Sequence, residues 1–68
     1  MNYSLDNLSE REKDVLVLIT QGNTNREVGE ILEITEATVK THRKHIKKKL
    51  KARNTADLCK IAQSCGLI

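Results

Sequence analysis

Apolar residues recur at the three- and four-residue spacing of an amphipathic helix in four successive segments. No segment shows sustained alternation of apolar and polar residues, so no strand is predicted. Four helices and no strand make the predicted fold all-α. Each helix is expected to bury its apolar positions against the other helices. The inward positions are Val15, Leu16 and Ile19, then Val28, Ile31 and Leu32, then Val39, Ile46 and Leu50, and last Leu58, Ile61, Ala62 and Cys65.

Polar residues ahead of each segment mark where the helices begin. Two of these starts have a serine or threonine followed three positions later by glutamate, the pattern of a capping box. Glycine is expected to end the first and last helices, because it adopts the left-handed conformation that follows many helices. The predicted caps are Ser9 with Glu12, Thr24 with Glu27, Thr35, and either Asn54 or Thr55, and the predicted stops are Gly22 and Gly66.

The chain has 68 residues, contains no proline, and shows no linker, repeat or low-complexity segment. This length corresponds to one small domain with a modest core. We expect residues 1–7 to be a flexible lead-in and residues 8–68 to form the domain.

The second and third segments have the spacing of a helix-turn-helix. A short helix capped by Thr24 leads into a turn at residues 33–35, and a longer helix is predicted over residues 36–51. Ile34 is expected to fill the corner between the two helices. Gly29 costs about 1 kcal/mol relative to alanine inside a helix, which makes sense if the two helices approach closely there. A generic helical hairpin is the alternative on spacing alone.

Positive charge is concentrated in the third helix, where residues 40–51 hold seven of the twelve basic residues. At about 100° per residue, most of these side chains gather on an arc away from the apolar stripe. A helix of this kind can bury one face and present a positive field to a polyanion. The arc consists of Lys40, Lys44, Lys47, Lys48 and Lys51.

Charge is also divided unevenly along the chain. Residues 1–36 hold eight acidic and three basic residues, a net charge of −5, whereas residues 37–68 hold one acidic and nine basic residues, a net charge of +8. Such asymmetry indicates a nucleic acid or an anionic surface that is approached from one side. Tyr3 is the sole aromatic residue, so the stacking surfaces of single-strand and RNA binders are missing and duplex DNA is favoured. A membrane surface is disfavoured because the apolar stripe has no tryptophan or phenylalanine to insert.

Catalysis, metal binding and cofactors are not expected. A core this small has little room for an active-site pocket, and the histidines at 42 and 45 have no third metal ligand nearby. Cys59 and Cys65 are six residues apart on one predicted helix, a separation of about 9 Å along its axis, which argues against a disulfide. With no export signal or membrane-spanning run, a reducing cytoplasmic location is expected.

The chain resembles the LuxR-type (GerE-like) DNA-binding domain of bacterial transcription regulators. The resemblance covers residues 8–68 with order and spacing intact, and its most specific part runs from Thr35 to His42 and continues at Lys49-Leu50. It departs from the family at three positions. Gly29 stands where alanine is usual and Ala52 where valine is frequent, which indicates lighter core packing. Thr55 stands where many members have an arginine, which removes one expected phosphate contact.

The resemblance implies a four-helix fold whose third helix enters the major groove of duplex DNA. Lysine suits guanine O6 and N7, and the threonine methyl suits that of thymine. Other polar and basic residues are expected to hold the phosphate backbone. The expected base contacts are Lys40, Thr41 and Lys44, and the expected phosphate contacts are Asn25, Arg26, Thr38, Arg43, Lys47, Lys48 and Lys51.

Specificity from one such helix is limited, so two copies are expected on half-sites about one helical turn apart. Similar domains pair through the last helix, and a weak dimer assembled on DNA is the expectation here. The expected pairing residues are Lys60, Gln63, Ser64, Leu67 and Ile68. The predicted function is sequence-specific transcription regulation in the bacterial nucleoid, with RNA polymerase or a larger regulator as a further candidate partner. The alternative is a small interaction protein that titrates a larger LuxR-type regulator.

Overall fold

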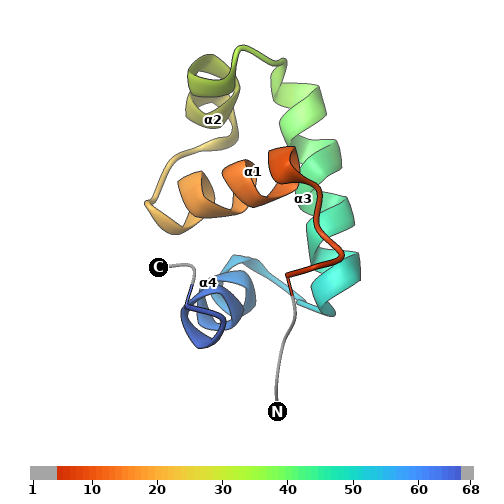
Figure 1. The fold of residues 1–68 in the computed structure, drawn as a ribbon. Helices are drawn as coiled ribbons and strands as arrows, with labels where there is room; N and C mark the ends of the chain where they lie inside the picture. The colour runs from red at the N-terminus through yellow and green to blue at the C-terminus, as the bar shows by residue number, and fades with distance from the viewer. Residues whose placement is uncertain (1–4, 67–68) are drawn as a thin grey trace.

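The computed structural model describes residues 5–66, which form four helices and no strand (Figure 1). The all-α, four-helix prediction is therefore confirmed. In chain order the elements are α1 (Glu10–Thr20), α2 (Asn25–Leu32), α3 (Glu36–Leu50) and α4 (Thr55–Ser64).

A side chain caps the start of every helix. Ser9 and Thr24 form the two predicted capping boxes, in which each accepts from the backbone N–H three residues on and the glutamate there accepts in return. Thr35 caps α3 by accepting from the Thr38 N–H. Of the two candidates for α4, Asn54 is the cap, because its Oδ1 accepts from the Asp57 N–H at 2.9 Å.

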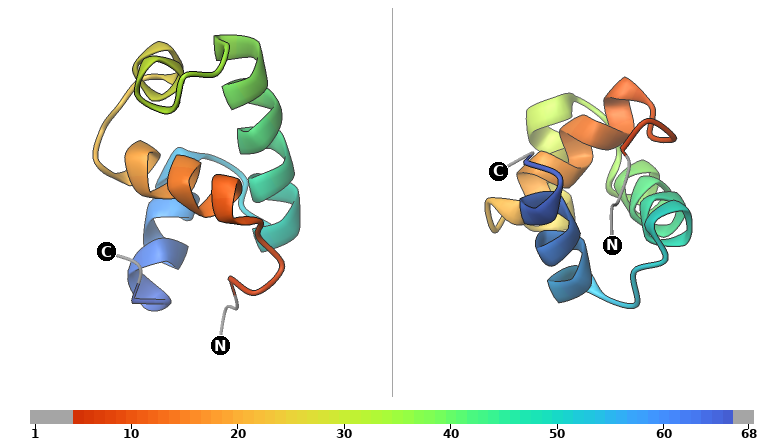
Figure 2. Two further views of the ribbon diagram at one scale, coloured as in Figure 1. Left: turned by 45° about the horizontal axis from the view of Figure 1, so that its top comes forward. Right: turned by 60° about the horizontal axis from the view of Figure 1, so that its bottom comes forward.

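The helix α1 lies at the centre of the fold and packs against the other three. In Figure 1, α2 lies above α1, α4 lies below it, and α3 runs alongside; the two further views agree (Figure 2). No packing contact joins α2 to α4 within residues 5–66. The relative placement of these two helices is therefore set through α1 and α3.

The core consists entirely of aliphatic side chains, and four of its members are the fully buried Val15, Leu16, Val39 and Ile46. Most predicted inward positions lie there, but the prediction for Ile31 was wrong, since this residue is 54% exposed. The short α2 turns its Val28 side toward the core, and Ile31 lies at the edge of that side.

The corner between α2 and α3 is tight at Gly29. A Cβ atom on Gly29 would lie 2.7 Å from the carbonyl oxygen of Ile34, which is backbone of the turn. The Ile34 N–H donates to the Gly29 carbonyl at 2.9 Å, and the Ile34 side chain packs against the core. The close approach expected at Gly29 is thus present, but it is made by the turn rather than by α3 itself.

The helix α3 ends at Leu50, one residue before the predicted end. Lys51 has a φ of 55° and caps the helix in the left-handed conformation. Glu33 ends α2 in the same way, with a φ of 58°. Both residues occupy backbone conformations that favour glycine.

The expected lead-in lies only partly within the described residues. Residues 5–8 form a turn in which the Leu8 N–H donates to the Leu5 carbonyl at 3.0 Å. Leu8 is buried and Leu5 packs against the core. This end of the chain therefore covers part of the core.

Candidate nucleic-acid interface

The helix α3 buries one stripe and exposes the rest of its surface. Val39, Ile46 and Leu50 are its buried residues, as predicted. At about 100° per residue, Arg43 lies about 40° to one side of this stripe and Lys49 about 80° to the other. These two cations face neighbouring helices, whereas the lysines between them lie on the outer arc.

On one side of the stripe, Lys49 forms an ion pair with α1. Its Nζ lies 2.8 Å from Oε1 of Glu12, whose side chain is only 4% exposed, while the Lys49 side chain is 39% exposed. Burial raises the pKa of Glu12, but the hydrogen bonds from Lys49 and Ser9 lower it by more, so the pKa lies below its ordinary value. The pair therefore joins the first capping box to α3.

On the other side, the half-buried Arg43 reaches two helices at once. Its Nη1 donates to Oδ1 of Asn25 at 2.9 Å, and its Nη2 donates to Oγ1 of Thr55. Asn25 is the first residue of α2 and Thr55 the first of α4, so Arg43 joins two helix starts. The sequence offered a signal for this, because Arg43 lies closest to the buried stripe of all the basic residues on α3.

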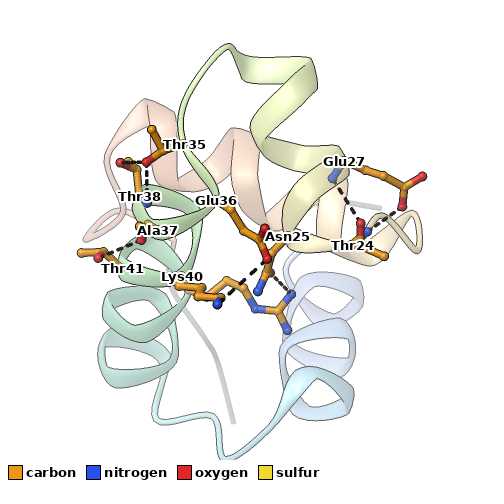
Figure 3. Close-up of polar contacts among 10 residues, drawn as sticks. Thr24, Asn25, Glu27, Thr35, Glu36, Ala37, Thr38, Lys40 and Thr41 are labelled. Atoms are coloured by element: carbon orange, nitrogen blue, oxygen red, sulfur yellow. Dashed lines mark hydrogen bonds and ion pairs between the residues drawn. The ribbon is translucent and has the colours of Figure 1, made fainter.

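The outer arc of α3 is exposed at Lys40, Lys44 and Lys48 and half-buried at Lys47. Lys40 carries the one acidic partner recorded on this arc within residues 5–66, Glu36, at 4.0 Å (Figure 3). The pair joins two exposed side chains four residues apart, an arrangement of little energetic weight. The arc therefore keeps its positive field.

Two threonines on α3 have their hydroxyls engaged locally (Figure 3). The Thr41 hydroxyl donates to the Ala37 carbonyl at 3.1 Å, which leaves its methyl as the group available on the surface. The Thr38 and Thr35 hydroxyls lie 2.9 Å apart and share one hydrogen bond. A threonine at 41 is thus suited to apolar contact more than to hydrogen bonding.

Beside the arc lies an open groove of about 650 Å³. It combines the start of α2, the outer side of α3 and the chain just after α3. No acidic side chain lines it, so it is a cationic groove. Its lining residues are Asn25, Lys40, Arg43, Lys44, Lys47, Ala52 and Arg53.

The groove gathers five of the ten residues expected to contact DNA and adds one that the sequence analysis did not single out. Arg53 lies two residues after Lys51, the left-handed cap of α3. Asp57 accepts from the Arg53 backbone N–H and from its Nε, and the pKa of Asp57 is lowered as a result. The expected residues outside the groove are Arg26, Thr38, Thr41, Lys48 and Lys51.

Arg26 lies away from the groove and pairs with Glu30 on the same helix, with Nε and Oε1 3.1 Å apart. Lys51 lines a second, smaller hollow of about 340 Å³ between the end of α3 and α4. Lys60 and Ser64 line this hollow too, and with Gln63 they are exposed on α4. The other two expected pairing residues, Leu67 and Ile68, lie outside the described residues.

Two features are absent from residues 5–66. No helix there is long and apolar enough to cross a membrane. No group of three or more His, Cys, Asp or Glu side chains comes together as a metal site in that range.

The helices α2 and α3 form a helix-turn-helix, and α3 presents a cationic outer face. These two features are those of the class of helix-turn-helix DNA-binding domains. Comparison with known sequences identifies the particular family. The chain belongs to the luxR family of bacterial regulatory proteins (GerE), whose profile matches residues 6–62. The resemblance found in the sequence is thereby confirmed, and the chain is a LuxR-type DNA-binding domain.

Similar proteins are regulators. The chain is 48% identical over 63 residues to the transcriptional regulatory protein MctR of Rhizobium johnstonii, which covers 93% of the chain and 29% of that protein. It is 43% identical over 53 residues to the nitrate/nitrite response regulator NarL of Escherichia coli K12, which covers 78% of the chain and 24% of NarL. Each of these proteins is thus more than three times as long as the segment it shares with this chain.

A solved structure agrees with the fold. The crystal structure of Escherichia coli SdiA matches the whole chain with a TM-score of 0.87 and 38% sequence identity, over 28% of the SdiA chain. The match covers α1 to α4 and so includes the helix-turn-helix.

Proposed function

We propose that this domain binds duplex DNA in a sequence-specific manner, with α3 in the major groove, and that it regulates transcription as a pair of copies on adjacent half-sites. The single observation that carries the proposal is the outer arc of α3, where four lysines lie on the side of the helix away from the core. An α-helix fits the major groove of B-DNA, and basic side chains along its outer face meet the phosphates on both sides.

Base contacts are assigned to Lys40, Thr41 and Lys44 near the start and middle of α3. Lysine donates to guanine O6 and N7. The Thr41 hydroxyl is engaged with the Ala37 carbonyl, so this residue offers its methyl to the methyl of thymine. The proposed preference is therefore for sites that combine guanine with a neighbouring thymine.

Phosphate contacts are assigned to residues that flank these positions. Asn25 begins α2, where unpaired backbone N–H groups and the positive end of the helix dipole favour an anion. The remaining assignments are basic or hydroxyl side chains of α2, of α3 and of the residue that caps α3: Arg26, Thr38, Lys47, Lys48 and Lys51. Arg53, which lines the cationic groove together with Asn25 and Lys47, joins them.

Pairing of two copies is assigned to α4. Lys60, Gln63 and Ser64 are exposed there, and Leu67 and Ile68 follow in the sequence. This surface is largely polar, so the domain is proposed to be a monomer in solution that pairs on DNA. Two half-sites about 10 base pairs apart would place both copies on one side of the duplex.

Selection of bound duplexes from a random pool at physiological salt tests the proposal. Enrichment of two similar half-sites about 10 base pairs apart is the expected result, with 1:2 stoichiometry of duplex to protein. Enrichment of a single half-site would remove the pairing proposal and keep sequence-specific binding. Binding without any enrichment would contradict the assigned base contacts, and absence of binding would favour the titrating interaction protein.

A further inference from the structure

Arg43 links the starts of two other helices within the proposed DNA-binding surface. The helices α2 and α4 share no packing contact within the described part of the chain. The guanidinium of Arg43, which projects from α3 between them, donates to Asn25 at the start of α2 and to Thr55 at the start of α4. The planar fork of a guanidinium can serve two acceptors at fixed angles, which an ammonium group cannot do.

The bond to Asn25 determines which end of its amide is available. Oδ1 of Asn25 accepts from Nη1 of Arg43 at 2.9 Å. An amide held through its oxygen has the two donors of Nδ2 left to offer. Asn25 lines the cationic groove, so the arrangement selects a donor for an anion there, and the reversed amide would place an oxygen against that anion.

The bond to Thr55 gives a reason for a neutral residue at that position. An arginine at this position would place a second guanidinium beside Arg43, which would add like charge and remove an acceptor. With threonine, Oγ1 accepts from Nη2 of Arg43. The departure at Thr55 and the arginine at 43 therefore belong to one arrangement.

We infer that Arg43 is a positioning residue of the DNA-binding surface, which orients Asn25 toward a backbone phosphate and ties the start of α4 to the same point. It acts through Asn25 and does not itself contact the phosphate. This inference rests on the proposed binding of duplex DNA and replaces the direct phosphate contact that the sequence suggested for Arg43.

A double-mutant cycle in DNA binding tests it, with the full chain and a selected duplex. Asn25→Ala is expected to weaken binding about 10-fold, in line with loss of one hydrogen bond to a charged group. In the Arg43→Lys background the same substitution should have little further effect, because the amide is no longer oriented. Arg43→Lys alone should weaken binding about as much as Asn25→Ala and leave the slope of log K against log salt unchanged.

Lys48→Ala is the matched control on the same helix. It removes an exposed charge with no recorded partner among residues 5–66, so the salt slope should fall by about 0.9 and its effect should add to that of Asn25→Ala. If Arg43 bound phosphate directly, lysine would largely replace it and the effects of the two substitutions would add. That result would overturn the inference.

Thr55→Val keeps the charge of Arg43 and removes only the acceptor at an exposed position. It is expected to weaken binding about threefold with an unchanged salt slope, and full affinity would overturn the role given to the start of α4.

Helix content and thermal unfolding of each free variant separate these effects from loss of fold. If the unsubstituted chain bound no duplex, the proposed function would fail, whereas binding with additive effects would overturn only the role of Arg43.

Discussion

Lys49 Nζ lies 2.8 Å from Glu12 Oε1 and joins α3 to α1 across 37 residues of sequence. The same carboxylate accepts from the Ser9 backbone N–H at 2.9 Å as part of the first capping box. One glutamate therefore caps α1 and anchors α3 to the centre of the fold.

Substitution of this glutamate should destabilise the domain. Glu12→Ala leaves the Ser9 N–H and Lys49 without their acceptor, and an unsatisfied buried group costs about 1–3 kcal/mol. Urea unfolding followed by circular dichroism measures the change. Glu10→Ala is the control, because Glu10 is 91% exposed and pairs loosely with Lys13, and it should change the free energy of unfolding by less than about 0.5 kcal/mol. Equal effects of the two substitutions would contradict the anchoring role.

Acid should destabilise the domain through the same group. The folded-state pKa of Glu12 lies below its ordinary value, which is about 4.3 in the unfolded chain. The stabilising contribution of ionised Glu12 is therefore fully present above the pKa of the unfolded chain. It is lost as the pH falls through the lower pKa of the folded state. The lowered pKa values of Glu27 and Asp57, each held by a backbone N–H, act in the same direction.

Removal of the lysine should reduce this acid-induced loss of stability. In Lys49→Met the burial of Glu12 remains while the charge and hydrogen bond of Lys49 are lost, so the pKa of Glu12 should rise. Thermal unfolding between about pH 2.5 and pH 7 should then show a smaller loss of stability on acidification than in the unsubstituted chain, because the folded and unfolded pKa values of Glu12 no longer differ in the same way. Lys13→Met, whose partner is exposed, should leave the acid-induced loss unchanged. An unchanged acid-induced loss in Lys49→Met would show that Lys49 does not lower the pKa of the Glu12 carboxylate.

The two kinds of lysine on α3 should differ in DNA binding. Lys44→Ala is expected to cost about 1–3 kcal/mol on the preferred site and to relax the preference there, as removal of a base contact does. Lys48→Ala should weaken binding to all duplexes alike and lower the salt slope by about 0.9. Titrations on a preferred and a scrambled duplex at several salt concentrations make the comparison. Identical behaviour of the two variants would contradict the division between base and phosphate contacts.

Left-handed caps offer a way to separate stability from binding. Glu33 and Lys51 have φ values of 58° and 55°, and this conformation costs a non-glycine residue about 1 kcal/mol. Glu33→Gly and Lys51→Gly should each raise the free energy of unfolding by about 0.5 kcal/mol after the entropy of glycine is deducted. Lys51→Gly should also weaken DNA binding, since it removes a proposed phosphate contact. Lys51→Ala, which loses the charge but keeps the strain, should weaken binding without the gain in stability.

Alanine at position 29 should strain the corner of the helix-turn-helix. The added Cβ would lie 2.7 Å from the Ile34 carbonyl oxygen, and relief of the clash requires the turn to shift. Overpacking of this kind costs about 1–3 kcal/mol, partly offset by the better helix propensity of alanine. A net loss of about 1 kcal/mol in urea unfolding is expected for Gly29→Ala. A rise in stability would show that the turn moves freely.

Much of the fold could be predicted from the sequence because the signals are local. A serine or threonine three residues before a glutamate fixes a helix start, and an apolar stripe fixes the buried side of α3. The exposure of Ile31 was missed because α2 has only eight residues, and periodicity in so short a segment does not determine which edge of the stripe is covered. The close approach at Gly29 could be foreseen because glycine is costly inside a helix, but its distance from the Ile34 carbonyl depends on the path of the turn.

The candidate site was predictable in part for the same reason. The lysines of the outer arc follow directly from the helical repeat. Arg43 and Arg53 depend on where α2 and α4 lie relative to α3, and that placement is tertiary. Arg43 could be assigned to phosphate from its charge alone, whereas its two partners lie 18 and 12 residues away in sequence.

The four capping residues have a consequence for how the chain acquires its fold. Each cap bonds to an N–H only three residues away, so helix boundaries can be defined while the chain is still extended elsewhere. Contacts so close in sequence carry little loop-closure entropy, and helical domains rich in them reach the native state in microseconds to milliseconds. The step that remains is the packing of the four helices through their aliphatic faces, after the caps have defined where each helix begins.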